Sequence, residues 1–208
     1  MIPRYQKIIF IVLLASSLAM AGLLWHLRQR AHQRLLAGED SAPTQAPEVE
    51  PAEQATLVAA NDADGSLLAQ ERSLPLPADP GTRARVLLGK LLDLYAAEDS
   101  AHPVPGGAKG ITQVFLLPVP KPTDASVPDA ELAVVNLTDT FVASHPSGIE
   151  TESLTVLSVC ATLRANFPRI TEVRFLVDGQ TRSTLAGHAD LTQTYLTANA
   201  MPTGGASQ

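Results

Sequence analysis

The chain has 208 residues, of which 45% are hydrophobic and 17% charged, and its formal net charge is −6. The length suits one domain of ordinary size with accessory segments. The charge is uneven, because residues 1–36 hold five Lys or Arg and no acidic residue, which leaves 10 basic and 21 acidic residues in the remainder. An acidic body repels phosphate groups, so the sequence argues against a nucleic-acid partner.

Cys160 is the only cysteine, which excludes an internal disulfide and a zinc site built from several cysteines. It lies at helical spacing among apolar residues, and free cysteines in such settings are mostly buried. We therefore expect an inert thiol in the core.

A basic tail, residues 1–7, precedes an apolar run, residues 8–27, that contains no Asp, Glu, Lys or Arg. About 20 such residues cross a bilayer as a helix. The alternative is a cleavable signal peptide, since Ala19-Met20-Ala21 resembles a cleavage site. The apolar run continues through Trp25, which suits a membrane interface, so we favour an uncleaved anchor. No cysteine lies near it for lipid attachment.

Basic residues flank the apolar run on both sides, so charge alone does not fix its orientation. A short basic tail before one apolar segment favours a signal anchor with the body exported. Residues 28–54 then combine a basic juxtamembrane segment with a Pro-, Ala- and Glu-rich stretch that has little to bury, which is typical of a linker.

The body is expected over residues 55–196, starting with a hairpin of strands at residues 56–60 and 66–74. The polar turn between them is similar to the start of a calcium loop, but position twelve counted from Asp62 is Ser73, where such a loop needs Glu. A helix should follow over residues 80–97, with Asp79 as its N-cap and Pro80 in its first turn. The glycine-rich stretch at residues 106–110 lacks the spacing of a phosphate-binding loop.

Strands are expected at residues 111–117 and 130–137, and a short turn at Phe141 and Val142. The next helix should begin with a capping box made by Ser147 and Glu150 and end before Pro168. Its predicted core face consists of Leu154, Leu157, Cys160, Ala161, Leu163 and Phe167. A strand through residues 173–177 then reaches the turn dipeptide Asp178-Gly179. Residues 191–196 should close the domain, and residues 197–208 should form a disordered tail.

These elements predict an α+β protein, with an N-terminal transmembrane helix and one compact domain of two main helices packed on a mixed or antiparallel sheet. Within it, the run from Ala133 to Phe141, the Thr-Leu pair near the helix end and the Val-Asp-Gly turn are arranged in an order that resembles the GerMN domain family. The resemblance covers about residues 55–195. Asn136 departs from the pattern, because the family often has Asp there.

The resemblance implies a domain on the outer side of a bacterial cytoplasmic membrane, and it carries over family-motif positions with a structural or interaction role. These positions are Asp139, Phe141, Gly148, Glu152, Thr162, Leu163, Asp178, Gly179, Gly187 and His188. The family has no established catalytic residues. We therefore expect a single-pass protein of the inner membrane whose domain faces the periplasm and serves as a non-catalytic interaction module, with an envelope protein or the cell wall as partner and no cofactor.

The alternative is an envelope hydrolase, in which Asp178 or Asp190 orients His188 and Ser147 or Ser183 is the nucleophile. No motif of a known hydrolase class frames these residues. A metal site is a third reading, with His102, His145 and His188 as the histidines of the body. They lack metal-ligand spacing, so we expect no metal.

Overall fold

The computed structural model describes residues 5–6, 13–14, 16–26, 52–119 and 129–200. They fall into two units, one within residues 1–48 and one within residues 49–208. The described residues of the first unit are helical, and no helix in the described part of the chain is long and apolar enough to cross a membrane. Residues 8–12, 15 and 27 of the expected span, and the expected linker up to residue 51, lie outside the described residues.

The second unit opens with a hairpin, as predicted. Strand β1 (Ala52–Asn61) pairs antiparallel with β2 (Ser66–Pro75), and Gly65 supplies a positive φ of 67° in the turn. The other edge of β1 lies along two helices, where side chains accept hydrogen bonds from alternate amides: Thr56 donates to Asn166, Val58 to Thr162 and Ala60 to Tyr95. These bonds satisfy an edge that would otherwise be open to another strand.

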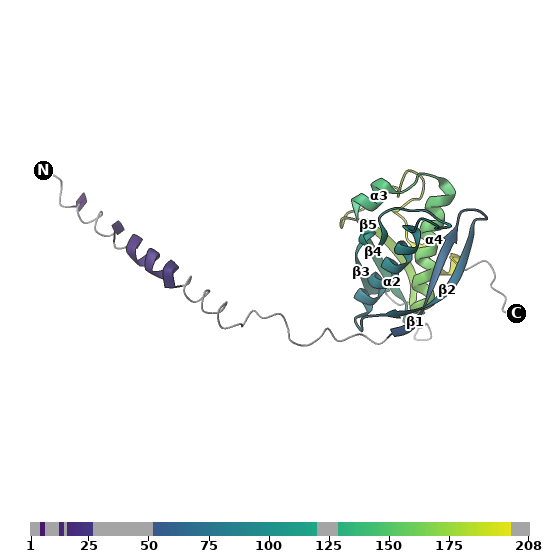
Figure 1. Cartoon of the computed structure of the whole chain (residues 1–208), viewed down its shortest axis with the longest axis horizontal. Helices are drawn as coiled ribbons and strands as arrows, with labels where there is room; N and C mark the ends of the chain where they lie inside the picture. Colours follow the sequence, from purple (N-terminus) through teal and green to yellow (C-terminus); the bar gives the residue numbers. More distant parts are fainter. Residues whose placement is uncertain (1–4, 7–12, 15, 27–51, 120–128, 201–208) are drawn as a thin grey trace. The chain divides into compact units, whose positions relative to one another are not determined.

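A four-stranded sheet forms the rest of the framework, in the order β3 (Ile111–Pro118), β4 (Glu131–Leu137), β5 (Ile170–Val177) and β6 (Tyr195–Leu196). Only β4 and β5 are parallel, so the sheet is mixed. A parallel pair needs a long crossover, and here the connection holds α3 (Asp139–Ser144) and α4 (Ile149–Asn166). The carboxyl ends of β4 and β5 therefore meet at one edge of the sheet (Figure 1).

Helix α2 (Pro80–Tyr95) begins as predicted, because the Asp79 carboxylate accepts a hydrogen bond from the Thr82 amide and Pro80 occupies the first turn. Its apolar face joins the core through Ala84, Leu87, Leu88, Leu91, Leu92 and Tyr95. A 3₁₀ turn, η1 (Gly107–Gly110), leads from the loop after α2 into β3.

Helix α4 is buried on more sides than the sequence predicted. Leu154, Cys160, Ala161 and Leu163 are in the core as expected, whereas Leu157 and Phe167 pack at its margin. The helix contacts both the hairpin and β5, so Val156, Val159 and several polar side chains are buried as well. Cys160 is fully buried, as expected, and burial raises the pKa of its thiol to about 12.

Three local predictions are wrong. Gly148, not Ser147, is the N-cap of α4, and no side chain of the expected capping box caps the helix. Phe141 and Val142 lie in the short helix α3 instead of a turn. The expected tail begins with a second 3₁₀ turn, η2 (Thr197–Asn199), because the buried Thr197 hydroxyl donates to the Ile170 carbonyl; residues 201–208 lie outside the described residues.

Candidate functional site

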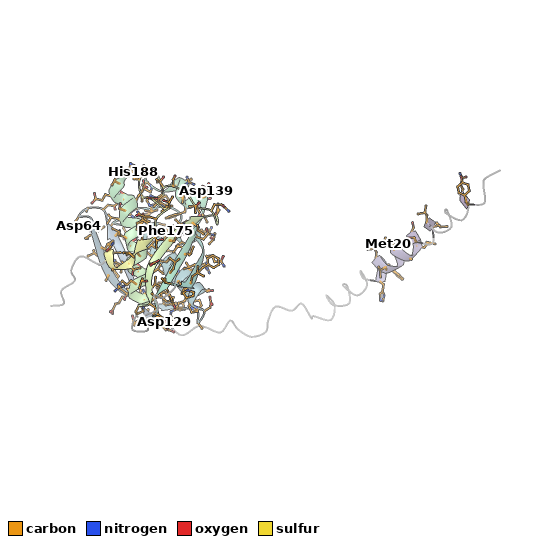
Figure 2. The ribbon with its side chains drawn as sticks, turned by 180° about the vertical axis from the view of Figure 1, so that it is seen from behind. Met20, Asp64, Asp129, Asp139, Phe175 and His188 are labelled. Carbon is orange, nitrogen blue, oxygen red and sulfur yellow. The ribbon has the colours of Figure 1, made fainter. Side chains whose placement is uncertain are left out.

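The expected site residues collect mainly at the edge where β4 and β5 end. Figure 2 places Asp139 and His188 at this end of the domain, with Asp129 at the opposite end. Three segments build the region: the residues after β4, the start of α4 and the loop that follows β5. Polar residues at the carboxyl ends of parallel strands meet in this way because both strands run in the same direction.

The turn after β5 has the geometry that its Asp-Gly dipeptide predicts. Both Asp178 and Gly179 have positive φ, 47° and 76°, and the Val177 and Gln180 backbones bond to each other across the turn. The Gly179 amide donates to the Asn136 side-chain oxygen at 2.7 Å. An amide oxygen and a carboxylate oxygen both accept such a bond, so an Asp at position 136 could make the same contact as Asn136.

Asp139 lies at the first position of α3 and forms an ion pair with Arg182 at 2.6 Å. Its own amide donates to the Asp178 carboxylate at 3.4 Å, so three exposed charged side chains surround the turn. Exposed ion pairs contribute little stability, about 0.5 kcal/mol. This cluster therefore adds charge to the surface more than it stabilises the fold.

Glu152 forms more hydrogen bonds than any other described side chain of the region. It is fully buried in the first turn of α4, and its carboxylate accepts hydrogen bonds from four backbone amides. Three amides of the loop, those of Ala186, His188 and Ala189, meet one oxygen at 2.9 Å each. The other oxygen receives the Gly148 amide and His188 Nδ1. One carboxylate thus fastens the loop to the start of the helix.

Burial on its own would raise the pKa of the Glu152 carboxyl, but the amides of Ala186, Ala189 and His188 and the His188 ring more than offset it. The net effect lowers the pKa to about 2. Glu152 is therefore a permanent anion at neutral pH, and its charge is neutralised by the donors of the loop.

His188 is exposed and has neighbours that resemble part of a hydrolase triad. Its Nδ1 lies 2.9 Å from a Glu152 oxygen and 3.5 Å from the Ser147 hydroxyl. In a triad the carboxylate and the serine contact opposite nitrogens, so that the ring passes a proton from one side to the other. Here both contact the same nitrogen, so the arrangement lacks the geometry of a triad.

The other residues of the hydrolase hypothesis are not brought to His188. The Asp178 carboxylate accepts from the Asp139 amide, and the Asp190 carboxylate accepts from the Thr192 amide and hydroxyl. Ser183 takes part in the loop through its carbonyl, which accepts from the Leu191 amide.

The remaining expected positions have structural roles. Phe141 is buried so close to Gly110 that a Cβ on that glycine would lie 2.7 Å from its ring. Thr162 accepts the hydrogen bond from β1, and Leu163 is fully buried in the core. Gly187 has a φ of 127°, which favours glycine, and passes close to the Ser147 hydroxyl.

Two buried histidines, missed as a pair by the sequence analysis, share one hydroxyl group. His102 Nε2 and His145 Nε2 lie 2.7 Å and 2.8 Å from the Thr155 oxygen. His102 Nδ1 contacts the Asp62 carboxylate at 2.5 Å, and His145 Nδ1 contacts the Pro146 carbonyl at 2.8 Å. All four ring nitrogens are thus engaged in hydrogen bonds and none is directed at a third ligand such as His188.

The Pro146 carbonyl determines the position of one hydrogen in this network. The carbonyl of Pro146 only accepts, so His145 Nδ1 carries a hydrogen, and burial lowers the pKa of His145 and keeps that ring neutral. The Thr155 hydroxyl, which lies within hydrogen-bonding distance of both histidines, also donates to the Thr151 carbonyl at 3.1 Å.

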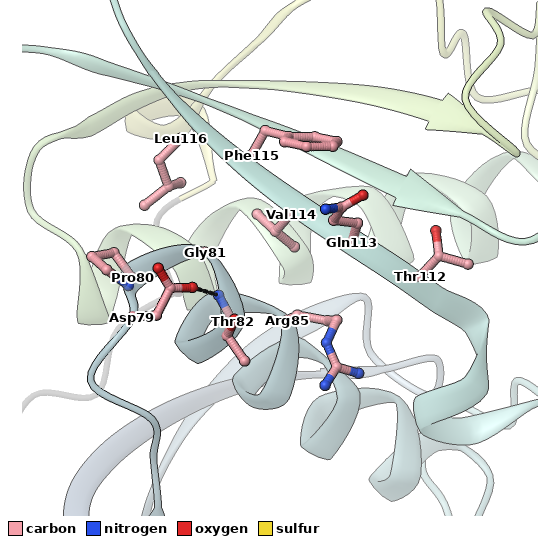
Figure 3. Close-up of a pocket in the computed structure, with 10 residues that line it drawn as sticks. All are labelled: Asp79, Pro80, Gly81, Thr82, Arg85, Thr112, Gln113, Val114, Phe115 and Leu116. Carbon is pink, nitrogen blue, oxygen red and sulfur yellow. Dashed lines mark hydrogen bonds between the residues drawn. The ribbon is translucent and has the colours of Figure 1, made fainter. Parts of the chain in front are cut away.

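A groove of about 530 Å³ lies away from this region, between the start of α2 and β3 (Figure 3). Asp79, Arg85 and Gln113 are among its polar lining residues. The Asp79 carboxylate already accepts the Thr82 amide at the helix start. An anion at this helix start would meet a carboxylate that occupies the same position, so the groove does not form an anion site.

Sequence reasoning missed Asp62, Thr155 and Ile149. Asp62 and His102 are 40 residues apart, and no spacing rule connects them. Ile149 is the first residue of α4 and is 72% exposed, which is unusual for a large apolar side chain.

Comparison with known proteins gives one family match. Residues 53–183, more than half of the chain, match the family model described as "Germane: Sporulation and spore germination". A search of curated proteins found no significant match. A crystal structure named "Putative Lipoprotein from Clostridium perfringens" matches with 18% identity and a TM-score of 0.33, over 75% of this chain and 95% of the other. Identity and TM-score at this level establish neither the fold nor the function of this chain.

Proposed function

Since the chain belongs to the Germane (GerMN) family of sporulation and spore germination domains, we propose that it is a non-catalytic interaction module of the bacterial envelope, tethered to the membrane by residues 8–27. The docking surface is formed by Ser147, Ile149, Gly187 and His188, which we call the loop surface. The partner is another envelope protein.

The bonding of Glu152 carries this proposal. The Glu152 carboxylate accepts hydrogen bonds from four backbone amides and contacts a ring nitrogen, so its lone pairs are occupied and it is poorly suited to act as a general base. Its role is to hold Gly187 and His188 in place. Ile149, a large exposed apolar side chain, follows Gly148 at the start of the same helix, α4. An apolar residue with polar groups around it, on a rigid support, is the usual composition of a protein docking site.

A photo-crosslinking amino acid at position 149 of the full chain in cells tests the proposal. We expect a discrete adduct at this position and none when the same group replaces Lys90, an exposed residue of α2. Glu152→Gln, which releases the loop, should abolish the adduct. Equal labelling at positions 149 and 90 would refute docking at the loop surface. Turnover of an ester or peptidoglycan substrate that is lost in His188→Ala would favour the hydrolase instead.

A further inference from the structure

The two faces of the four-stranded sheet differ in what they contact. Side chains alternate along a strand, and Val114, Ala133, Val135, Val173 and Phe175 point into the core that includes α2 and α4. The opposite side, which we call the outer face, carries exposed apolar residues. Figure 3 shows Phe115 on the side of β3 opposite Val114. Phe115 is 43% exposed and Leu117 47% exposed.

The outer face has a symmetric pattern. The backbones of Leu116, Ala133 and Val173, whose side chains point toward the core, are paired in register and form a row across β3, β4 and β5. Two outer-face residues flank this row on each strand: Phe115 and Leu117 on β3, Leu132 and Val134 on β4, and Glu172 and Arg174 on β5. A rotation of 180° about the row exchanges the two members of every pair.

We propose that the outer face binds a second copy of this chain, packed face to face about a two-fold axis that runs along this row. In the dimer, Phe115 of each chain packs on Leu117 of the other, and Leu132 on Val134. Glu172 of each chain meets Arg174 of the other, twice by symmetry. Stacked sheets about 10 Å apart bring side chains from the two faces into contact in this way.

The charges identify a second copy as the occupant. Among the described residues, neither Glu172 nor Arg174 forms a hydrogen bond or ion pair through its side chain. A face with one positive and one negative group on either side of its centre is complementary to itself. An isologous dimer needs this property, since the same patch must serve both chains.

Strand addition at the edge of β3 is less suited to this protein. The Val119 amide donates to the Ala130 carbonyl, so the backbone groups of Val119 are directed toward β4. Because this direction alternates along the strand, the backbone groups of Leu117 and Phe115 are also directed toward β4. Those of Val114 and Leu116 are directed outward, to the open edge of β3. At Val114 the outward carbonyl already lies against Gly81 of α2. At the other end Pro118 has no N–H to donate. The open face, and not the edge, is therefore available.

The dimer should be weak on its own. Three strands of about seven residues span roughly 23 by 14 Å. This footprint is well below the roughly 800 Å² that each partner buries in a stable complex. Association is therefore expected at concentrations of about 0.1 mM, or where a membrane tether concentrates the chains.

The inference is tested with charge variants of the full chain in neutral detergent. Their self-association is measured by sedimentation equilibrium up to about 0.5 mM. Glu172→Arg or Arg174→Glu places like charges together at two symmetric positions and should weaken association at least about tenfold. The double variant exchanges the two charges and should recover it. An equal mixture of the two single variants should associate too, because one chain then carries two positive groups and the other two negative groups.

The N-terminal segment is the same in all variants, so it cannot cause these differences. A wild-type chain that stays monomeric over this range would overturn the inference, and so would a double variant and a mixture that both fail to recover. Equal thermal melting of the single variants shows that the fold is retained. The inference uses a different surface from the loop surface, so an adduct at position 149 that persists in a monomeric chain would retain the proposed function and remove only the dimer.

Discussion

At the scale of single residues, Glu152 connects the start of α4 to a loop more than thirty residues further along the chain. One oxygen accepts hydrogen bonds from three loop amides, and the other contacts the amide of the helix N-cap and His188 Nδ1. A neutral side chain of the same shape has only one accepting atom. The charge and the second oxygen are therefore both needed.

Glu152→Gln tests this role through stability. The glutamine NH₂ must face amide donors and leaves at least one of them buried without an acceptor, which should lower the free energy of unfolding by about 3 kcal/mol. Urea denaturation of the folded unit at neutral pH measures the change. Glu150→Gln, two residues away and exposed, should change it by less than about 0.5 kcal/mol. Equal effects of the two substitutions would contradict the anchoring role.

The pH dependence of stability checks the same carboxylate independently. Its pKa is lowered from 4.5 to about 2 in the folded state, so its contribution is complete above pH 4.5 and is lost as the pH falls from 4.5 to 2. A shift of this size corresponds to about 3 kcal/mol. The difference between wild type and Glu152→Gln should therefore shrink over this range. His145, whose pKa is lowered by burial, adds a loss of stability that begins below its ordinary pKa of 6.5, because the unfolded state then binds the proton more readily.

At the scale of elements, the contact between α2 and β3 depends on the absence of a side chain. A Cβ on Gly81 would lie 2.8 Å from the Val114 carbonyl oxygen. Helix propensity alone favours alanine over glycine by about 1 kcal/mol. The Val114 carbonyl and the backbone of residue 81 are both held in regular structure, so neither can move without a cost in free energy. We therefore expect the steric clash to outweigh the gain in helix propensity.

Gly81→Ala should accordingly destabilise the folded unit by about 1–2 kcal/mol, a typical cost of overpacking. Chemical denaturation measures it, and Lys90→Ala, an exposed position on the same helix, serves as control. A stabilised Gly81→Ala variant would mean that helix and strand separate without cost.

The elements that the sequence predicted well are those whose pattern is local. The hairpin, α2 and the Asp178-Gly179 turn follow from alternation, capping and turn chemistry within short windows. Helix α4 was described incompletely, because Thr155 and Thr162 are buried against partners far away in the sequence, which no local window includes. Strand β6 has only two residues and is defined by its pairing with β5. The motif positions predicted where the site lies, but not that Glu152 organises it.

At the scale of the whole molecule, the two ends of the chain have opposite charge character. All five basic residues of the first 36 flank the apolar run, whereas the folded unit and its linker carry the acidic excess. If residues 8–27 anchor the chain as proposed, anionic lipid would repel the acidic folded unit. The acidic excess therefore favours contact with a protein partner over contact with lipid.

The tether itself is testable. The full chain should remain in the membrane pellet after carbonate extraction, and a chain that lacks residues 8–27 should be released, because a run of about 20 apolar residues inserts stably. A C-terminal alkaline phosphatase fusion should be active, since that enzyme folds only outside the cytoplasm. Release of the full chain by carbonate would contradict anchoring, and an inactive fusion that stays in the pellet would reverse the orientation. If the proposed tether is present, confinement to two dimensions would raise the local concentration of the domain, and the proposed outer-face contact, too weak to detect in dilute solution, should become populated at the membrane.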